Sequence, residues 1–164
     1  DGLLNGGHVI ILGNDNIKAG ISSYLPSNNR SEIHQGVGGN LVIKDFYNAN
    51  TSSMEAAIKN AAHIKDQKTL IIIIGDMFEM GEYSATEHER VVRYALEHSP
   101  EQLILVGDEF GKVDTDQYTS EIVKYPSIEH AIEALNGTSH LNTLFLLKAS
   151  NGMNFQKLFD SVQW

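Results

Sequence analysis

Three short segments carry polar side chains directly after an apolar run, which is where open α/β sheets bind their ligands. These segments are residues 45–50, 75–82 and 148–153. Their carboxylates, amides, phenol, hydroxyl and ammonium can bind sugar hydroxyls, carboxylates or amines. Because the carboxyl ends of parallel strands meet at one edge of a sheet, we expect the three segments to converge.

Each segment has both a binding and a purely structural interpretation. Asp45 is suited to accept hydrogen bonds from ribose hydroxyls, whereas Asn48 and Asn50 either bind a ligand or only shape the turn. Asp76 occupies a ligand-facing position, and Met77 beside it either covers a ligand or folds back on the core.

The third segment and a nearby histidine complete the candidate residues. Lys148 ends an apolar run, so its ammonium should emerge at the edge that carries Asp45 and Asp76. Ser150 and the amides after it either hold a carboxylate at a helix start or form a plain cap below a solvated lysine. His88 is the histidine of interest, because it falls in the first turns of the helix after the acidic loop.

Composition limits the classes of function. The chain has 164 residues, 12 basic and 21 acidic, hence a net charge of 12 − 21 = −9, which argues against a nucleic-acid partner. It lacks cysteine, so disulfides and thiolate chemistry are excluded, and a reducing cytoplasm is expected. No apolar run is long enough for a membrane span, and no metal-binding histidine spacing occurs.

The elements that must position these residues alternate between strands and helices. Apolar runs predict strands at 41–46, 69–74, 103–106 and 144–147, with a weaker strand at 121–125 and a hairpin partner at 32–35. Helical spacing predicts helices around 54–62, 91–96, 128–135 and 153–159. Capping boxes are expected at Ser52 with Glu55 and at Ser84 with Glu87.

This alternation predicts a Rossmann-like, doubly wound, mostly parallel α/β sheet. We expect residues 1–30 to form an appendage or linker from a preceding domain, and residues 31–164 to form the main domain. The stretch 107–113 resembles a phosphate loop, but it is one residue short and has Val113 in place of the magnesium-binding hydroxyl.

Taken in order, the motifs resemble the C-terminal domain of the Mur ligases, in particular the kind that adds D-Ala-D-Ala to UDP-N-acetylmuramoyl-tripeptide in peptidoglycan synthesis. The resemblance covers about residues 17–162 and rests on four motifs. They are Asn28-Asn29-Arg30-Ser31, Asp45-Phe46-Tyr47-Asn48-Ala49-Asn50 with Ser53-Met54, Gly75-Asp76-Met77-Phe78-Glu79-Met80-Gly81, and Lys148-Ala149-Ser150-Asn151-Gly152-Met153.

The resemblance implies an ATP-dependent ligase whose C-terminal domain closes over the nucleotide and brings in the peptide. The residues it places near the nucleotide are Arg30, Asp45, Tyr47, Asn48 and Asn50. Those it places near the peptide substrates are Asp76, Met77, His88, Lys148, Ser150 and Asn151. ATP and Mg²⁺ would be held mostly by other domains of the same polypeptide, so this chain alone is expected to be inactive. It is also expected to be folded and monomeric or weakly associated.

The sequence departs from the family pattern at two positions, where Thr51 replaces the usual proline and Ala149 the usual glycine. Two other hypotheses stay open. One is a phosphoacceptor signalling domain, since Asp76 and Lys148 have the right chemistry, although the acidic pair after the first strand is missing. The other is a degenerate binding domain that kept the fold but lost its substrate.

Overall fold

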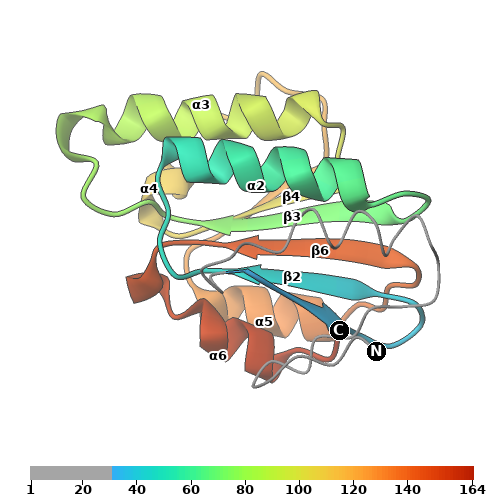
Figure 1. Cartoon of the computed structure of the whole chain (residues 1–164). Helices are drawn as coiled ribbons and strands as arrows, with labels where there is room; N and C mark the ends of the chain where they lie inside the picture. Colours follow the sequence, from blue (N-terminus) through green and yellow to red (C-terminus); the bar gives the residue numbers. More distant parts are fainter. Residues whose placement is uncertain (1–30) are drawn as a thin grey trace.

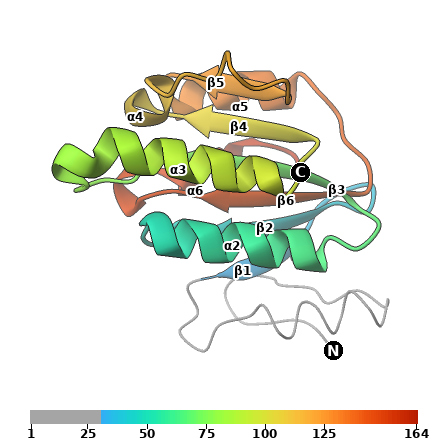
Figure 2. The ribbon, with the colours of Figure 1, turned by 90° about the horizontal axis from the view of Figure 1, so that it is seen from above.

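The computed structural model describes residues 31–164, which form a six-stranded sheet with the strand order β1-β2-β6-β3-β4-β5. Only β1 is antiparallel; it pairs with β2 at one edge of the sheet, as Figure 2 shows. All other neighbours are parallel. The strands are β1 (Glu32–Gln35), β2 (Leu41–Asp45), β3 (Thr69–Gly75), β4 (Gln102–Val106), β5 (Ile122–Tyr125) and β6 (Thr143–Lys148).

Helices cover both faces of the sheet (Figure 1), so the expected doubly wound α/β fold is confirmed. One face carries α2 (Thr51–Ile64), α3 (Ser84–Glu97) and the single turn α4 (Asp108–Gly111). The other face carries α5 (Ile128–Asn136) and α6 (Phe155–Ser161). Two short 3-10 turns, η1 (Gly81–Tyr83) and η2 (Asn151–Met153), precede α3 and α6.

The central strand β3 explains why its sequence is an unbroken apolar run. Successive side chains of a strand point to opposite faces. Leu70, Ile72 and Ile74 accordingly pack in the core under α2 and α3, whereas Ile71 and Ile73 pack in the core under α5 and α6. All five are at most 2% exposed, and each contributes about 1.5–3 kcal/mol of burial free energy relative to an exposed side chain.

The two weaker strand predictions are also confirmed. Residues 32–35 pair with β2 through the glycine-rich turn, with Ile33 opposite Ile43. The segment near 121–125 forms β5, which extends the parallel sheet beyond β4. The domain boundary after residue 30 stays a prediction, because residues 1–30 lie outside the described part of the chain.

Both predicted capping boxes are wrong in detail. Helix α2 begins two residues earlier than expected: Asn50 is its cap and accepts a hydrogen bond from the Ser53 amide at 2.8 Å, while Ser53 Oγ accepts from the Asn50 amide at 3.0 Å. Helix α3 has no side-chain cap. The turn η1 leads directly into it, so the amide of Ser84 already donates to the Gly81 carbonyl.

Among residues 31–164 no helix is long and apolar enough to cross a membrane.

Candidate functional site

The three polar segments leave the sheet at the same edge, as expected. The register places Asp45 at the end of β2 beside Lys148 at the end of β6. Lys148 in turn lies opposite Ile74, one residue before Gly75 at the end of β3. Residues 45–50, 75–82 and 148–153 therefore form one continuous rim, called here the carboxyl edge.

Asp45 and Lys148 form an ion pair at the centre of this edge. Lys148 Nζ lies 3.1 Å from Asp45 Oδ1 and donates to the Asn48 carbonyl at 3.0 Å. The lysine side chain is 2% exposed, so the alternative in which Lys148 is solvated is wrong. It joins two of the predicted residues across neighbouring strands and fixes the segment that carries Asn48.

Asp76 is a buried helix cap. The residue directly follows β3 and is 4% exposed. Its two carboxylate oxygens accept hydrogen bonds from the amides of Glu109 at 3.0 Å and Phe110 at 2.9 Å. These amides start α4 and would otherwise lack partners. The carboxylate thus ties the loop after β3 to the loop after β4.

The loop after β3 is folded inward. Met77 and His88 are 1% and 0% exposed, so in this conformation neither side chain reaches a ligand. Phe78 is 44% exposed, and its amide donates to Ser150 Oγ at 2.9 Å. Ser150 therefore supports the neighbouring loop, and no side-chain cap on η2 is formed.

The remaining predicted residues are more exposed. Asn50 caps α2, and Asn48 Oδ1 accepts from the following amide at 2.9 Å, so both also shape the turn. Tyr47 is 61% exposed and lines, with Asn151 and Phe155, a hollow of about 270 Å³ beside the end of β2. Arg30 lies outside the described residues.

A second hollow, of about 370 Å³, opens on the same edge between the ends of β3, β4 and β6. Its lining includes Asp76, Phe78, Asp108, Glu129 and Gly152. Of these, only Asp76 was a predicted site residue; Phe78 and Gly152 were named only as parts of the family motifs. Asp108 follows the strand predicted at 103–106, and Glu129 lies at the start of the helix predicted around 128–135. These positions at the strand ends were the signal that could have identified the two residues.

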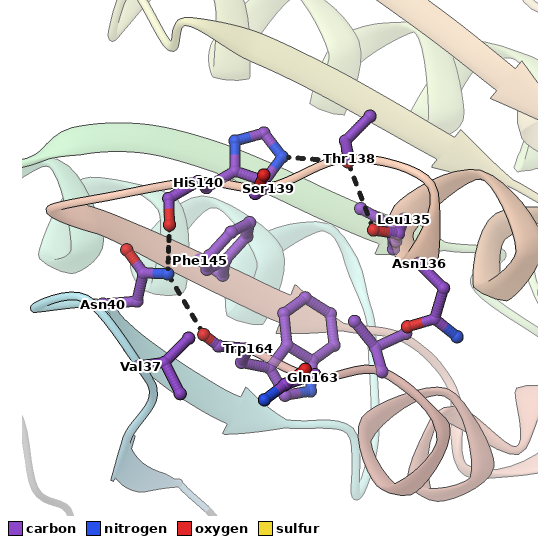
Figure 3. A pocket seen from close by; sticks show the side chains of 11 residues that line it. Val37, Asn40, Leu135, Asn136, Thr138, Ser139, His140, Phe145, Gln163 and Trp164 are labelled. Atoms are coloured by element: carbon purple, nitrogen blue, oxygen red, sulfur yellow. Dashed lines mark hydrogen bonds between the residues drawn. The ribbon is translucent and has the colours of Figure 1, made fainter.

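A third hollow lies at the opposite, amino-terminal end of the parallel strands, where β2 and β6 begin (Figure 3). Phe145 and Trp164 form its apolar part, and Asn40 donates to the carbonyls of His140 and Trp164 at its margin. None of the residues predicted from the sequence lines this hollow. We therefore place the candidate site at the carboxyl edge.

Gly107 holds a backbone position that sequence reasoning assigned only to a failed phosphate loop. Its φ is +117°, and a Cβ at this residue would lie 2.4 Å from Asp76 Oδ2. Only glycine combines this conformation with so close an approach. The glycine is therefore required for the Asp76 cap. The stretch 107–113 contains the single turn α4 (Asp108–Gly111).

Glu109 gives the site a pH-dependent contact. Hydrogen bonds from Lys112 at 2.7 Å and Ser84 at 2.6 Å hold the pKa of its carboxyl below the usual 4.5. A lowered folded-state pKa adds stability that is present above the unfolded-state pKa and is lost as pH falls through the folded value.

Replacing Glu109 by glutamine should therefore lower the free energy of unfolding by about 0.5 kcal/mol at neutral pH, the scale of an exposed pair. The difference from the unmodified chain should shrink as pH falls below 4.5 and vanish below the folded-state pKa. Urea unfolding at several pH values measures it, with Glu101→Gln as an exposed control. A difference that persists at low pH would contradict the assignment.

Comparisons with known proteins place this geometry in context. Residues 29–151 match the family model described as "Mur ligase, glutamate ligase domain". The UDP-N-acetylmuramoyl-tripeptide–D-alanyl-D-alanine ligase of Rickettsia prowazekii is 34% identical over 125 residues, which are 74% of this chain and 27% of that protein. The ligase of the same name from Mycobacterium leprae is 29% identical over 153 residues, 82% of this chain and 30% of that protein.

Solved structures agree on the fold. A crystal structure of MurF from Acinetobacter baumannii has a TM-score of 0.69 at 22% identity, covering 82% of this chain and 30% of that one. MurF ligase from Thermotoga maritima in complex with ADP has a TM-score of 0.69 at 18% identity, with the same coverage. The chain thus spans about 30% of the length of these relatives.

Proposed function

The chain belongs to the Mur ligase family, and we propose that it serves as the C-terminal domain of a UDP-N-acetylmuramoyl-tripeptide–D-alanyl-D-alanine ligase. Three of the four motifs shared with such ligases, all but residues 28–31, lie together on the carboxyl edge of the sheet. This clustering is the observation that carries the proposal. Relatives of that name match 74% and 82% of the chain.

The proposed reaction needs two steps. The terminal carboxylate of the tripeptide attacks the γ-phosphorus of ATP and forms an acyl phosphate with release of ADP. The amine of D-Ala-D-Ala then attacks the acyl carbon, phosphate leaves with the electrons of the C–O bond, and the nitrogen loses a proton. This domain would contribute the positioning of the amine, which is where proximity lowers the barrier.

The dipeptide would occupy the hollow between the ends of β3, β4 and β6. Its walls carry the carboxylates of Asp108 and Glu129, which attract an ammonium before it is deprotonated for attack. Ser127 and the N-terminus of α5 line the same hollow, and Glu129 lies in the first turn of that helix. The acidic lining therefore favours the amine end of the dipeptide.

The nucleotide would lie along the end of β2. Tyr47 offers an exposed aromatic face for a base, and Asp45 lies at the strand end where ribose hydroxyls are bound in such sheets. Within residues 31–164 no group of three His, Asp or Glu side chains is placed to hold a metal ion. We propose that the Mg²⁺ and phosphate ligands belong mostly to other domains of the same polypeptide.

The test is a chimera in which this chain replaces the C-terminal domain of the Rickettsia prowazekii ligase. With ATP, Mg²⁺ and UDP-N-acetylmuramoyl-tripeptide, phosphate release should depend on D-Ala-D-Ala, and the isolated chain should release none. A folded chimera that instead uses a single amino acid would refute the assigned substrate. Turnover by the isolated chain would refute the assigned role as a dependent domain.

The geometry does not favour a phosphoacceptor domain. Such a domain needs a carboxylate open to a phosphodonor, whereas Asp76 is 4% exposed and both of its oxygens accept backbone hydrogen bonds. Lys148, which would have to neutralise the phosphoryl group, is paired with Asp45.

A further inference from the structure

His88 contacts two backbone groups, and both of its ring nitrogens are used. Nε2 lies 3.0 Å from the amide nitrogen of Met77, which can only donate. Nδ1 lies 2.7 Å from the carbonyl oxygen of Ser84, which can only accept. The ring is therefore neutral, with its proton on Nδ1.

The loop after β3 is held at three consecutive backbone groups. The Asp76 carbonyl accepts from the Ser150 amide at 3.2 Å, the Met77 amide donates to His88, and the Phe78 amide donates to Ser150 Oγ. Two of these contacts come from the loop after β6. His88 supplies the one contact from α3.

His88 also links this loop to α4. Its ring packs edge-on against Phe110, with the centroids 4.6 Å apart, and the Phe110 amide donates to Asp76. Ser84, whose carbonyl accepts from His88, donates through Oγ to Glu109 at 2.6 Å. The histidine thus sits where α3, α4 and the loop after β3 meet, enclosed from solvent.

We infer that His88 is a positioning residue. As the Nδ1–H tautomer it fixes the Met77 amide, and so sets the place of Phe78 and Asp76 on the wall of the hollow between the ends of β3, β4 and β6. This assigns His88 an indirect role in place of the direct substrate contact expected from the sequence. The loop contact stands on geometry alone, whereas its effect on ligation rests on the proposed function.

Three replacements separate the two hydrogen bonds from the packing. His88→Gln places an amide oxygen where Nε2 lies and can still accept from Met77. His88→Asn is too short to reach Met77 but can donate to Ser84. His88→Leu retains apolar bulk and forms neither bond.

The first measurement uses the isolated chain and does not depend on ligase activity. Nitrogen-15 spectra of the His88 ring should show the proton on Nδ1, and the Met77 amide should exchange slowly with deuterated water. In His88→Asn and His88→Leu this exchange should accelerate roughly ten-fold or more, whereas in His88→Gln it should stay within a few-fold of the unmodified chain. A proton on Nε2, or equal Met77 protection in all variants, would overturn the inference.

The second measurement uses the chimera. His88→Asn should reduce kcat/KM for D-Ala-D-Ala by about 100-fold, the cost of a misplaced reactant, with little change in the KM for ATP, and His88→Gln should restore most of it. Equal activity of His88→Asn and the unmodified chimera would refute the positioning role. If the unmodified chimera fails to ligate D-Ala-D-Ala while the ring and exchange results hold, the proposed function is wrong and the loop contact stands.

Discussion

Replacing Gly107 by alanine is expected to lower the free energy of unfolding by about 3–5 kcal/mol, the sum of a strained backbone and an overpacked contact. The φ of +117° is rarely adopted by residues with a side chain, and the new Cβ would overlap the Asp76 carboxylate. Relief of that overlap would move Asp76 away from the amides that start α4, so the cap would also be lost.

Gly111→Ala is the matched control for this prediction. Gly111 lies four residues further along, at the end of α4, and a Cβ there meets nothing within 4 Å. Its replacement should change the free energy of unfolding by less than about 1 kcal/mol. Urea unfolding followed by circular dichroism compares the two variants. Equal stability of the two would mean that the Asp76–Gly107 contact does not hold the loops together.

Replacing Lys148 by methionine is expected to cost about 3 kcal/mol, because it leaves the Asp45 carboxylate, 14% exposed, without its partner. The loss should also release the segment that carries Asn48, whose carbonyl accepts from the same ammonium. The double variant Asp45→Asn/Lys148→Met should recover part of the stability, since no unpaired charge remains.

Lys157→Met controls for the loss of an ion pair as such. Lys157 lies 3.1 Å from Glu129, the same separation as in the Lys148 pair, but the two side chains are 52% and 61% exposed. Solvent screens such a pair, so its loss should lower the free energy of unfolding much less than the loss of Lys148 does. The test compares the unfolding free energies of the unmodified chain, Lys148→Met, the double variant and Lys157→Met. A Lys148→Met cost no larger than that of Lys157→Met would contradict the structural role of the buried pair.

The fold could be predicted because its signals are local. The continuous apolar run of β3 predicts a buried strand, and the helical spacing of apolar residues in α2 predicts a helix. The alternation of such elements allows few topologies. The cap of α2 was misassigned because Ser52 and Asn50 both satisfy the cap pattern, and only the backbone decides between them.

The candidate site was predictable only as far as the sheet edge. The position of Lys148 after an apolar run located its ammonium, but its pairing with Asp45 depends on two strands that are neighbours in space and about 100 residues apart in sequence. The burial of Asp76 and His88 depends equally on α4, a single turn without a periodic pattern. Long-range contacts of this kind leave no signal in one sequence.

We propose that the carboxyl edge of this domain receives the dipeptide. The most direct test of this binding is a titration of the nitrogen-15-labelled chain with millimolar D-Ala-D-Ala, monitored by backbone amide shifts, with L-Ala-L-Ala as the control. We expect shifts at Phe78, Gly107 and Gly152, which line the hollow at that edge, and much smaller shifts with the control. Shifts confined to Ser139 and Gln163 at the opposite edge, or an equal response to both dipeptides, would contradict it.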